Sequence, residues 1–274
     1  MAKQSKPEIY FHVGLGRTAT TFMQQSVFPK FKNIYYINKH QYRNADQIIE
    51  TTQQDKYLIS HEFSKKLINE MKQFSKKYPD AKIIIVLRRH DKWIASHFKR
   101  SLKNGFPSGF KGYFDLDEDN GFWKKEHLDY YSKLKCIDEC FHHKPLVLFH
   151  QDLKDDPGKF LQQILDYTGV KETAPISFKP RHTSYGNKEL KIREWVNQHT
   201  VFKEIGVKDY KFSELRRLYN KTIRYTVLNV AKLIPSSMVS DKPLIPEAEL
   251  ARIREYYQED WDKCLQYATE NNPV

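Results

Sequence analysis

Two short segments of the chain carry residues whose types and spacing suit the binding of phosphate groups. The first combines small residues, a cation and three hydroxyls in the order Leu15, Gly16, Arg17, Thr18, Ala19, Thr20 and Thr21. Backbone N–H groups in such a loop can converge on an anion at the positive end of the helix that follows. Arg17 can offer a forked pair of hydrogen bonds to phosphate oxygens. We expect an anion-binding loop, against the simpler alternative of a strand–helix turn capped by a threonine.

This loop departs from the Walker A motif of ATP-binding proteins. If Gly16, Arg17 and Thr18 ended such a motif, its first glycine would fall at position 11, which is Phe11. Arginine also stands where the motif requires lysine, and no aspartate pair suited to Mg²⁺ or HExxH zinc motif accompanies the loop. We therefore predict a phosphate site that uses no metal.

The second segment joins an apolar run to a helix. Arg88 follows the run Lys82–Leu87 directly, and Ser96 comes eight residues later on the expected helix. Open α/β sheets bind ligands beyond the carboxyl ends of their strands, so Arg88 and Ser96 could clamp one phosphate. The alternative is a solvated loop.

A third apolar run ends at two candidate bases. His61 and Glu62 follow Tyr57–Ser60 and should reach the same edge of the sheet. Either side chain could accept the proton of a hydroxyl that attacks an electrophile. The alternative is that they cap the helix expected near Ser64.

The elements that position these residues alternate between strand and helix. Short apolar runs precede helical stretches at Ile9–Val13, Tyr57–Ser60, Lys82–Leu87 and Leu146–Phe149. This rhythm predicts an α/β fold, with a central parallel β-sheet flanked by helices. Because Ile83–Leu87 is apolar at every position, we expect it to be the central strand, covered on both faces.

The remaining segments complete one predicted domain over residues 1–274, with a nucleotide-binding core at 9–170 and a mainly helical part at 171–274. Pro157 and Gly169 bracket a helix expected at Gly158–Tyr167. Four glycines make Asn104–Gly121 a long loop. Further helices are expected at Phe212–Leu233 and Pro246–Glu270.

The composition points to an anionic ligand. The formal net charge is +12, which favours phosphates, sulfates, nucleic acid or anionic lipid. Nucleic-acid-binding signatures are absent, so we predict no nucleic-acid partner. No signal peptide or bilayer-spanning segment can be read, and three cysteines are too few for a disulfide framework, so we expect a cytoplasmic protein. The apolar stripe of Phe212–Leu233 could contact a membrane surface, although such stripes more often face a core.

Taken together, these segments resemble the sulfotransferase family. The order Gly-Arg-Thr-Ala-Thr-Thr is similar to the family's Lys/Arg-Ser-Gly-Thr-Thr loop, and Arg88 and Ser96 have the spacing of its 3′-phosphate grip. Residues 145–153, 156–157 and 165–170 resemble its later strand and helix. The likeness covers roughly Ile9–Val170. Ala19 stands where glycine is usual, and Gln151 where glutamate is usual.

The resemblance implies a P-loop NTPase-like three-layer fold and the donor PAPS (3′-phosphoadenosine 5′-phosphosulfate). Arg17 and the N–H groups from Leu15 to Thr21 would hold the 5′-phosphosulfate, and Arg88 and Ser96 the 3′-phosphate. Arg181 would complete that second grip. The resemblance also favours Glu62 over His61 as the base. The acceptor would be a hydroxyl on a carbohydrate, a glycolipid or a small metabolite.

Two rival functions stay open at this point. A small-molecule kinase could use the same loop for ATP, but it would need the lysine and the Mg²⁺ ligands that the sequence lacks. A basic protein without catalytic activity could bind nucleotides or nucleic acid and transfer nothing.

Overall fold

The computed structural model describes residues 6–178, 185–199, 222 and 225–273. The chain divides into two compact units. The first, called here the sheet unit, comprises Met1–Trp93, Glu126–Lys179 and Tyr256–Val274; the second, the helical unit, comprises Ile94–Lys125 and Pro180–Glu255. The sheet unit is therefore assembled from three separate stretches of chain. The organisation of residues 1–274 as one domain stays a prediction.

A parallel sheet of five strands in the order β2-β3-β1-β4-β5 forms the centre of the sheet unit, as far as the described residues extend. The strands are β1 Glu8–Gly14, β2 Tyr35–Ile37, β3 Lys56–Glu62, β4 Lys82–Leu87 and β5 Leu146–Phe149. The four predicted strands and the parallel sheet are confirmed. The expectation that Ile83–Leu87 is the central strand is wrong: β4 lies between β1 and β5, and β1 occupies the middle. Both strands are buried on both faces, so an apolar run alone does not distinguish them.

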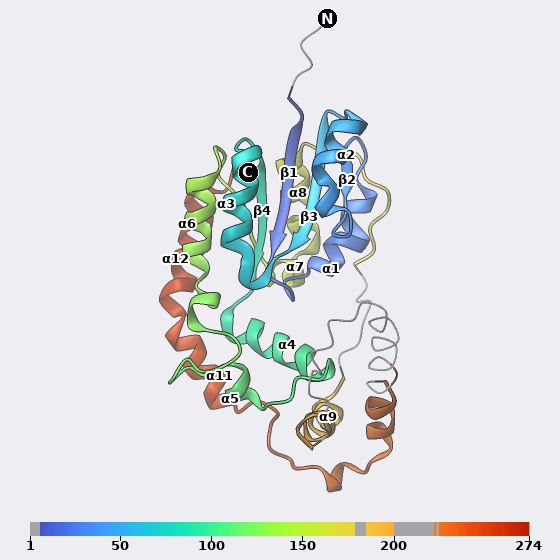
Figure 1. Cartoon of the computed structure of the whole chain (residues 1–274), viewed down its shortest axis with the longest axis vertical. Coiled ribbons are helices and arrows are strands. Elements are labelled where there is room, and N and C mark those ends of the chain that lie inside the picture. Colours follow the sequence, from blue (N-terminus) through green and yellow to red (C-terminus); the bar gives the residue numbers. More distant parts are fainter. Residues whose placement is uncertain (1–5, 179–184, 200–221, 223–224, 274) are drawn as a thin grey trace, which may run out of the picture. The chain divides into compact units, whose positions relative to one another are not determined.

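Helices cover both faces of this sheet, as the α/β rhythm predicts (Figure 1). The helices of the sheet unit are α1 Thr20–Phe22, α2 Ala45–Thr52, α3 Leu67–Lys77, α6 Tyr130–Cys140, α7 Asp152–Asp155, α8 Pro157–Thr168 and α12 Gln258–Asn271, and a π-helix, η1, spans Met23–Val27. On one face, Tyr10, Leu58 and Ile84 pack against η1 and α8. On the other, Phe11 contacts Phe74 of α3 with ring centroids 4.5 Å apart, and α6 and α12 continue that layer.

The chain leaves the sheet unit through α4, His90–Lys103. In the helical unit the described helices are α5 Phe110–Tyr113, α9 Asn187–His199, residues 225–233 and α11 Glu247–Tyr256. The loop expected at Asn104–Gly121 therefore contains one short helix. The single helix expected at Pro246–Glu270 is divided at Tyr257 into α11 and α12. Much of the helix expected at Phe212–Leu233 lies outside the described residues.

Short helical turns link the longer elements. They are η2 Phe28–Lys30, η3 Tyr42–Asn44, η4 Ser64–Lys66, η5 Lys125–Leu128 and η7 Ser236–Met238. The turns around α8 follow the sequence signals closely. Asp156 caps this helix by accepting from the Lys159 N–H at 2.9 Å, and Gly169 ends it with φ 64°.

Candidate active site at the carboxyl edge of the sheet

The predicted anion-binding loop connects the end of β1, at Gly14, to the start of α1, at Thr20. Two residues in it adopt the left-handed conformation: Arg17 has φ 73° and Ala19 has φ 65°. Such alternation turns successive N–H groups of a loop toward one side and creates an anion-binding concavity. Ala19 thus occupies a position that suits glycine, and its Cβ makes the conformation strained.

Three consecutive carbonyl groups of the loop are each held by a side chain. The Thr18 hydroxyl donates to the Leu15 carbonyl at 2.7 Å, the Trp93 indole Nε1 donates to that of Gly16 at 2.8 Å, and Arg88 Nη1 donates to that of Arg17 at 3.1 Å. Within a trans peptide the carbonyl and the next N–H point in opposite directions. The N–H groups of Gly16, Arg17 and Thr18 therefore point away from the side chains that hold the loop.

The three threonines of the loop lie in different environments. Thr18 is buried, and its role in anion binding stays a prediction; its hydroxyl donates to the Leu15 carbonyl. It closes the loop because the carbonyl three residues earlier lies within its reach. Thr20 is buried, and its Oγ1 has no hydrogen-bond partner among the described residues. Thr21 is exposed. Thr20 therefore offers an unsatisfied hydroxyl at the start of α1, where a ligand oxygen would complete it.

A buried polar cluster lies between the strands that carry the loop and the candidate base. Gln24 Nε2 of η1 donates to Ser60 Oγ at 3.1 Å, and Ser60 Oγ is 2.8 Å from His12 Nδ1. Tyr36 donates its hydroxyl to the Gln24 carbonyl at 3.3 Å. Burial lowers the pKa of His12 to about 3, so this ring is neutral. The cluster connects η1 to β1 and β3. It could not be predicted from the sequence because its members are far apart in the chain.

The two candidate bases lie on opposite faces of β3. Glu62 is the last residue of the strand and pairs in register with Gly14. Strand alternation places it on the face of Ser60, where η1 packs. His61 is on the other face, where its ring lies 4.6 Å from that of Tyr42 and 4.7 Å from that of Phe63. Burial is the main cause that lowers the pKa of His61.

Cationic side chains gather beside the loop at the same edge of the sheet. Burial and then the charge of Arg17 lower the pKa of Arg88. Burial, followed by the charges of Arg88, Lys154 and Arg17, lowers the pKa of His150 to about 4. His150 follows β5 as Arg88 follows β4, and its N–H donates to the Leu87 carbonyl at 2.7 Å. His150 is not among the predicted site residues, although its place directly after a strand is a signal that could have found it.

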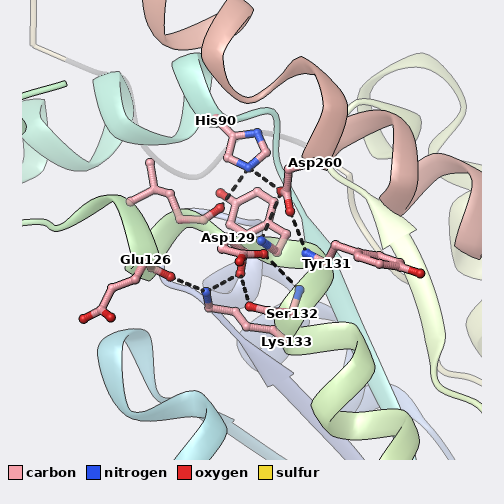
Figure 2. Close-up of polar contacts among 9 residues, drawn as sticks. His90, Glu126, Asp129, Tyr131, Ser132, Lys133 and Asp260 are labelled. Atoms are coloured by element: carbon pink, nitrogen blue, oxygen red, sulfur yellow. Dashed lines mark hydrogen bonds and ion pairs between the residues drawn. The ribbon is translucent and has the colours of Figure 1, made fainter. Parts of the chain in front are cut away.

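A buried imidazole fixes the chain just after Arg88. His90 Nε2 lies 2.9 Å from both the Leu128 carbonyl and Asp260 Oδ2, and its ring is stacked between Tyr130 and Tyr257, with centroids 4.1 and 4.4 Å away. Figure 2 shows Asp260 of α12 facing both His90 and the start of α6. There the carboxylate accepts from the N–H groups of Tyr130 and Tyr131, at 3.1 and 2.9 Å. Asp260 therefore anchors the starts of α4 and α6 together.

The start of α6 is reinforced from a second side. Asp129 caps the helix by accepting from the Ser132 N–H at 2.9 Å. The ammonium of Lys133 donates to the Asp129 carbonyl at 2.6 Å and to that of Glu126 at 3.4 Å (Figure 2). Burial lowers the pKa of Lys133 to about 8. These contacts hold the segment before α6 against the first turn of that helix.

Two predicted phosphate ligands are not tested by this geometry. Ser96 lies on the second turn of α4 and belongs to the helical unit. Arg181 lies outside the described residues. Their roles stay predictions.

Two properties of the described residues bear on metal binding and membranes. They contain no group of three or more His, Cys, Asp or Glu side chains placed to hold a metal ion. Within the same residues, no helix combines the length and the apolar character needed to cross a bilayer.

Comparison with solved structures identifies the architecture. A sulfotransferase from Alicyclobacillus acidocaldarius superposes with a TM-score of 0.52 at 13% identity, over 70% of this chain and 93% of that one. Mouse sulfotransferase SULT7A1 complexed with PAP gives 0.43 at 14% identity, over 62% of each chain. A sulfotransferase domain from the curacin biosynthetic pathway gives 0.36 at 12%, over 63% of this chain and 76% of that one. No protein-family model and no curated protein sequence matches the chain.

Proposed function

The chain has the fold of the sulfotransferases, and from it we propose an enzyme that transfers a sulfuryl group from PAPS to an acceptor hydroxyl. The observation that carries the proposal is the loop Leu15–Thr21, with three carbonyls held by side chains and with Arg17, Arg88 and His150 beside it. Such a site is suited to a nucleotide that carries phosphate at more than one position.

In the proposed complex the loop and the cations divide the donor between them. Arg17, Thr20 and the N–H groups of the loop bind the 5′-phosphosulfate. Arg88 binds the 3′-phosphate, with Ser96 and Arg181 as its predicted partners. Thr20 fits this role because its buried hydroxyl has no partner among the described residues.

The reaction is an in-line displacement at sulfur. The acceptor oxygen forms a bond to sulfur while the bond from sulfur to the 5′-phosphate oxygen breaks, which releases 3′,5′-ADP. Glu62 takes the proton of the acceptor hydroxyl. Arg17 and the loop N–H groups stabilise the negative charge that grows on the leaving phosphate. The register that places Glu62 beside Gly14 supports this assignment over His61.

A direct assay tests the proposal against its rivals. The purified protein is incubated with PAPS carrying labelled sulfate and a pool of carbohydrates, glycolipids and small hydroxyl metabolites, with EDTA present. We expect label transfer that survives EDTA and is lost in Arg17→Ala, whereas Arg254→Ala, which changes an exposed arginine of α11, keeps it. Transfer of phosphate from ATP that requires Mg²⁺ would support a kinase. Binding of 3′,5′-ADP without transfer to any acceptor would support a non-catalytic protein.

The acceptor and the place of reaction form part of the same proposal. In the helical unit, Leu233 and Met238 are 83% and 77% exposed, and the exposed Lys232 and Lys242 lie nearby in the chain. Exposed apolar side chains next to lysines suit the surface of an anionic membrane. We therefore propose that the protein contacts the cytoplasmic face of a membrane. A glycolipid in that membrane is one of the proposed acceptors. Sedimentation with phosphatidylglycerol vesicles should fall in the double variant Leu233→Ser, Met238→Ser, and equal sedimentation would contradict the contact.

A further inference from the structure

We infer that Trp93 is a positioning residue for the anion-binding loop, because its indole holds the peptide between Gly16 and Arg17 in the orientation that binds a 5′-phosphate group. The inference deepens the proposed function and rests on it for the identity of the ligand. The contact itself depends only on the sheet unit, to which both Trp93 and the loop belong.

Trp93 lies in the first turn of α4, and its side chain is fully buried. Its Nε1–H donates to the Gly16 carbonyl at 2.8 Å. Its own backbone N–H donates to the Arg89 carbonyl at 2.8 Å, so the residue is fixed to the helix that follows β4. The indole therefore connects the first turn of α4 to one particular peptide of the loop.

This peptide has a second orientation in which its backbone would be less strained. Rotation of the peptide plane by about half a turn changes ψ of Gly16 and φ of Arg17 and leaves the rest of the chain nearly in place. It would move Arg17 from φ 73° into the negative region that L-residues prefer. The same rotation would turn the Arg17 N–H to the opposite side of the loop. The strained orientation therefore needs a contact that the rotation would break. The hydrogen bond from Trp93 to the Gly16 carbonyl is such a contact.

The neighbouring peptide is held in the same way and from the same segment. Arg88 donates to the Arg17 carbonyl at 3.1 Å, five residues before Trp93 in the chain. The end of β4 and the start of α4 therefore orient two successive N–H groups, those of Arg17 and Thr18. The side chain at position 93 is fully buried and must also donate a hydrogen bond to the loop. Tryptophan meets both requirements, because its indole is a large aromatic ring that carries an N–H donor.

The test compares ligands with and without the 5′-phosphate. Trp93→Phe keeps an aromatic ring and removes the donor. By calorimetry, we expect its Kd for 3′,5′-ADP to rise about tenfold, the loss of one hydrogen bond, with an unchanged Kd for adenosine 3′-monophosphate. Trp195→Phe, at a tryptophan that is 61% exposed, should change neither value. Equal weakening for both ligands, or no weakening for either, would overturn the inference.

Two further measurements separate this inference from protein stability and from the proposed reaction. Replacement of Trp93 by benzothienylalanine, which has sulfur in place of the indole N–H, should reproduce the loss even if Trp93→Phe folds poorly. In an ¹⁵N spectrum of wild type, the Arg17 amide signal should shift on addition of 3′,5′-ADP. The shift should be smaller in the benzothienylalanine variant.

If wild type binds 3′,5′-ADP with this pattern but transfers no sulfuryl group, the proposed function fails and the role of Trp93 stands. If wild type binds no nucleotide, the comparison is made with pyrophosphate, and equal affinities would overturn the inference.

Discussion

The Arg88 guanidinium donates a hydrogen bond to the backbone carbonyl of Arg17, at 3.1 Å. One arginine thus connects the end of β4 to the loop after β1. Arg88, which we propose binds the 3′-phosphate, therefore also contacts the loop proposed to bind the 5′-phosphosulfate.

Replacement of Arg88 should weaken the binding of both phosphate-bearing ends of the nucleotide. We expect Arg88→Ala to raise the Kd for 3′,5′-ADP by about tenfold to a hundredfold, since a charged hydrogen bond to phosphate is lost. Because the Arg17 carbonyl also loses its donor, the Kd for 5′-AMP should rise as well, by a smaller factor. Calorimetry with 3′,5′-ADP and 5′-AMP measures how the loss of affinity is divided between the two phosphate sites. An unchanged Kd for 5′-AMP would show that the contact with Arg17 does not order the loop.

Replacement of Glu62 should affect turnover and spare the donor. Glu62→Gln keeps the size of the side chain and removes the base, so kcat should fall by about a hundredfold or more with an unchanged Kd for 3′,5′-ADP. His61→Phe is the matched control, because His61 packs among aromatic rings on the other face of β3. A large loss of kcat in His61→Phe, with normal turnover in Glu62→Gln, would reverse the assignment.

Replacement of Ala19 by glycine should stabilise the protein. At φ 65° the alanine Cβ destabilises the folded state by about 1–2 kcal/mol. Glycine removes this strain, but its greater conformational entropy in the unfolded chain offsets part of the gain. The melting temperature should therefore rise by roughly 1–3 °C. Ala95→Gly, the same change inside the regular helix α4, should lower stability by about 1 kcal/mol. Thermal unfolding of the two variants gives shifts of opposite sign if the backbone of the loop is strained as described.

Protonation of His150 should be coupled to anion binding. Burial and the charges of Arg88, Lys154 and Arg17 lower the pKa of its imidazole to about 4. A bound phosphate offsets those charges and raises that pKa, so binding takes up a proton and affinity increases as the pH falls from about 6.5 toward 4. His150→Gln should lack this part of the pH dependence. The difference between wild type and variant in Kd for 3′,5′-ADP, measured from pH 7.5 to 5, removes the contribution of the ligand's own titration. Identical pH profiles would exclude the coupling.

The sequence predicts what depends on local pattern. Continuous apolar runs identify four strands, and Pro157 with Gly169 marks the limits of α8 within one residue. The three-residue strand β2 escapes detection because so short a segment has no periodicity. The division between α11 and α12 at Tyr257 carries no glycine or proline, and packing of Tyr257 on His90 accompanies it.

The dependence on local pattern also separates the parts of the site that the sequence predicts from those that it does not. The loop and Arg88 can be read from the chain because they follow strands. Trp93, Gln24 and Asp260 could not, because each contacts residues 36 to 170 positions away. Only the folded sheet brings such pairs together, and no spacing rule in a single sequence encodes them.

The contact between His90 and Asp260 has a consequence for the synthesis of the protein. Asp260 is part of the last stretch of the sheet unit, Tyr256–Val274, whereas His90 is part of the first. A ribosome-bound chain that ends before residue 256 has every residue of the loop and of β4 but lacks the carboxylate that anchors the start of α4. The start of α4 can therefore be anchored to α12 only after Asp260 has been synthesised.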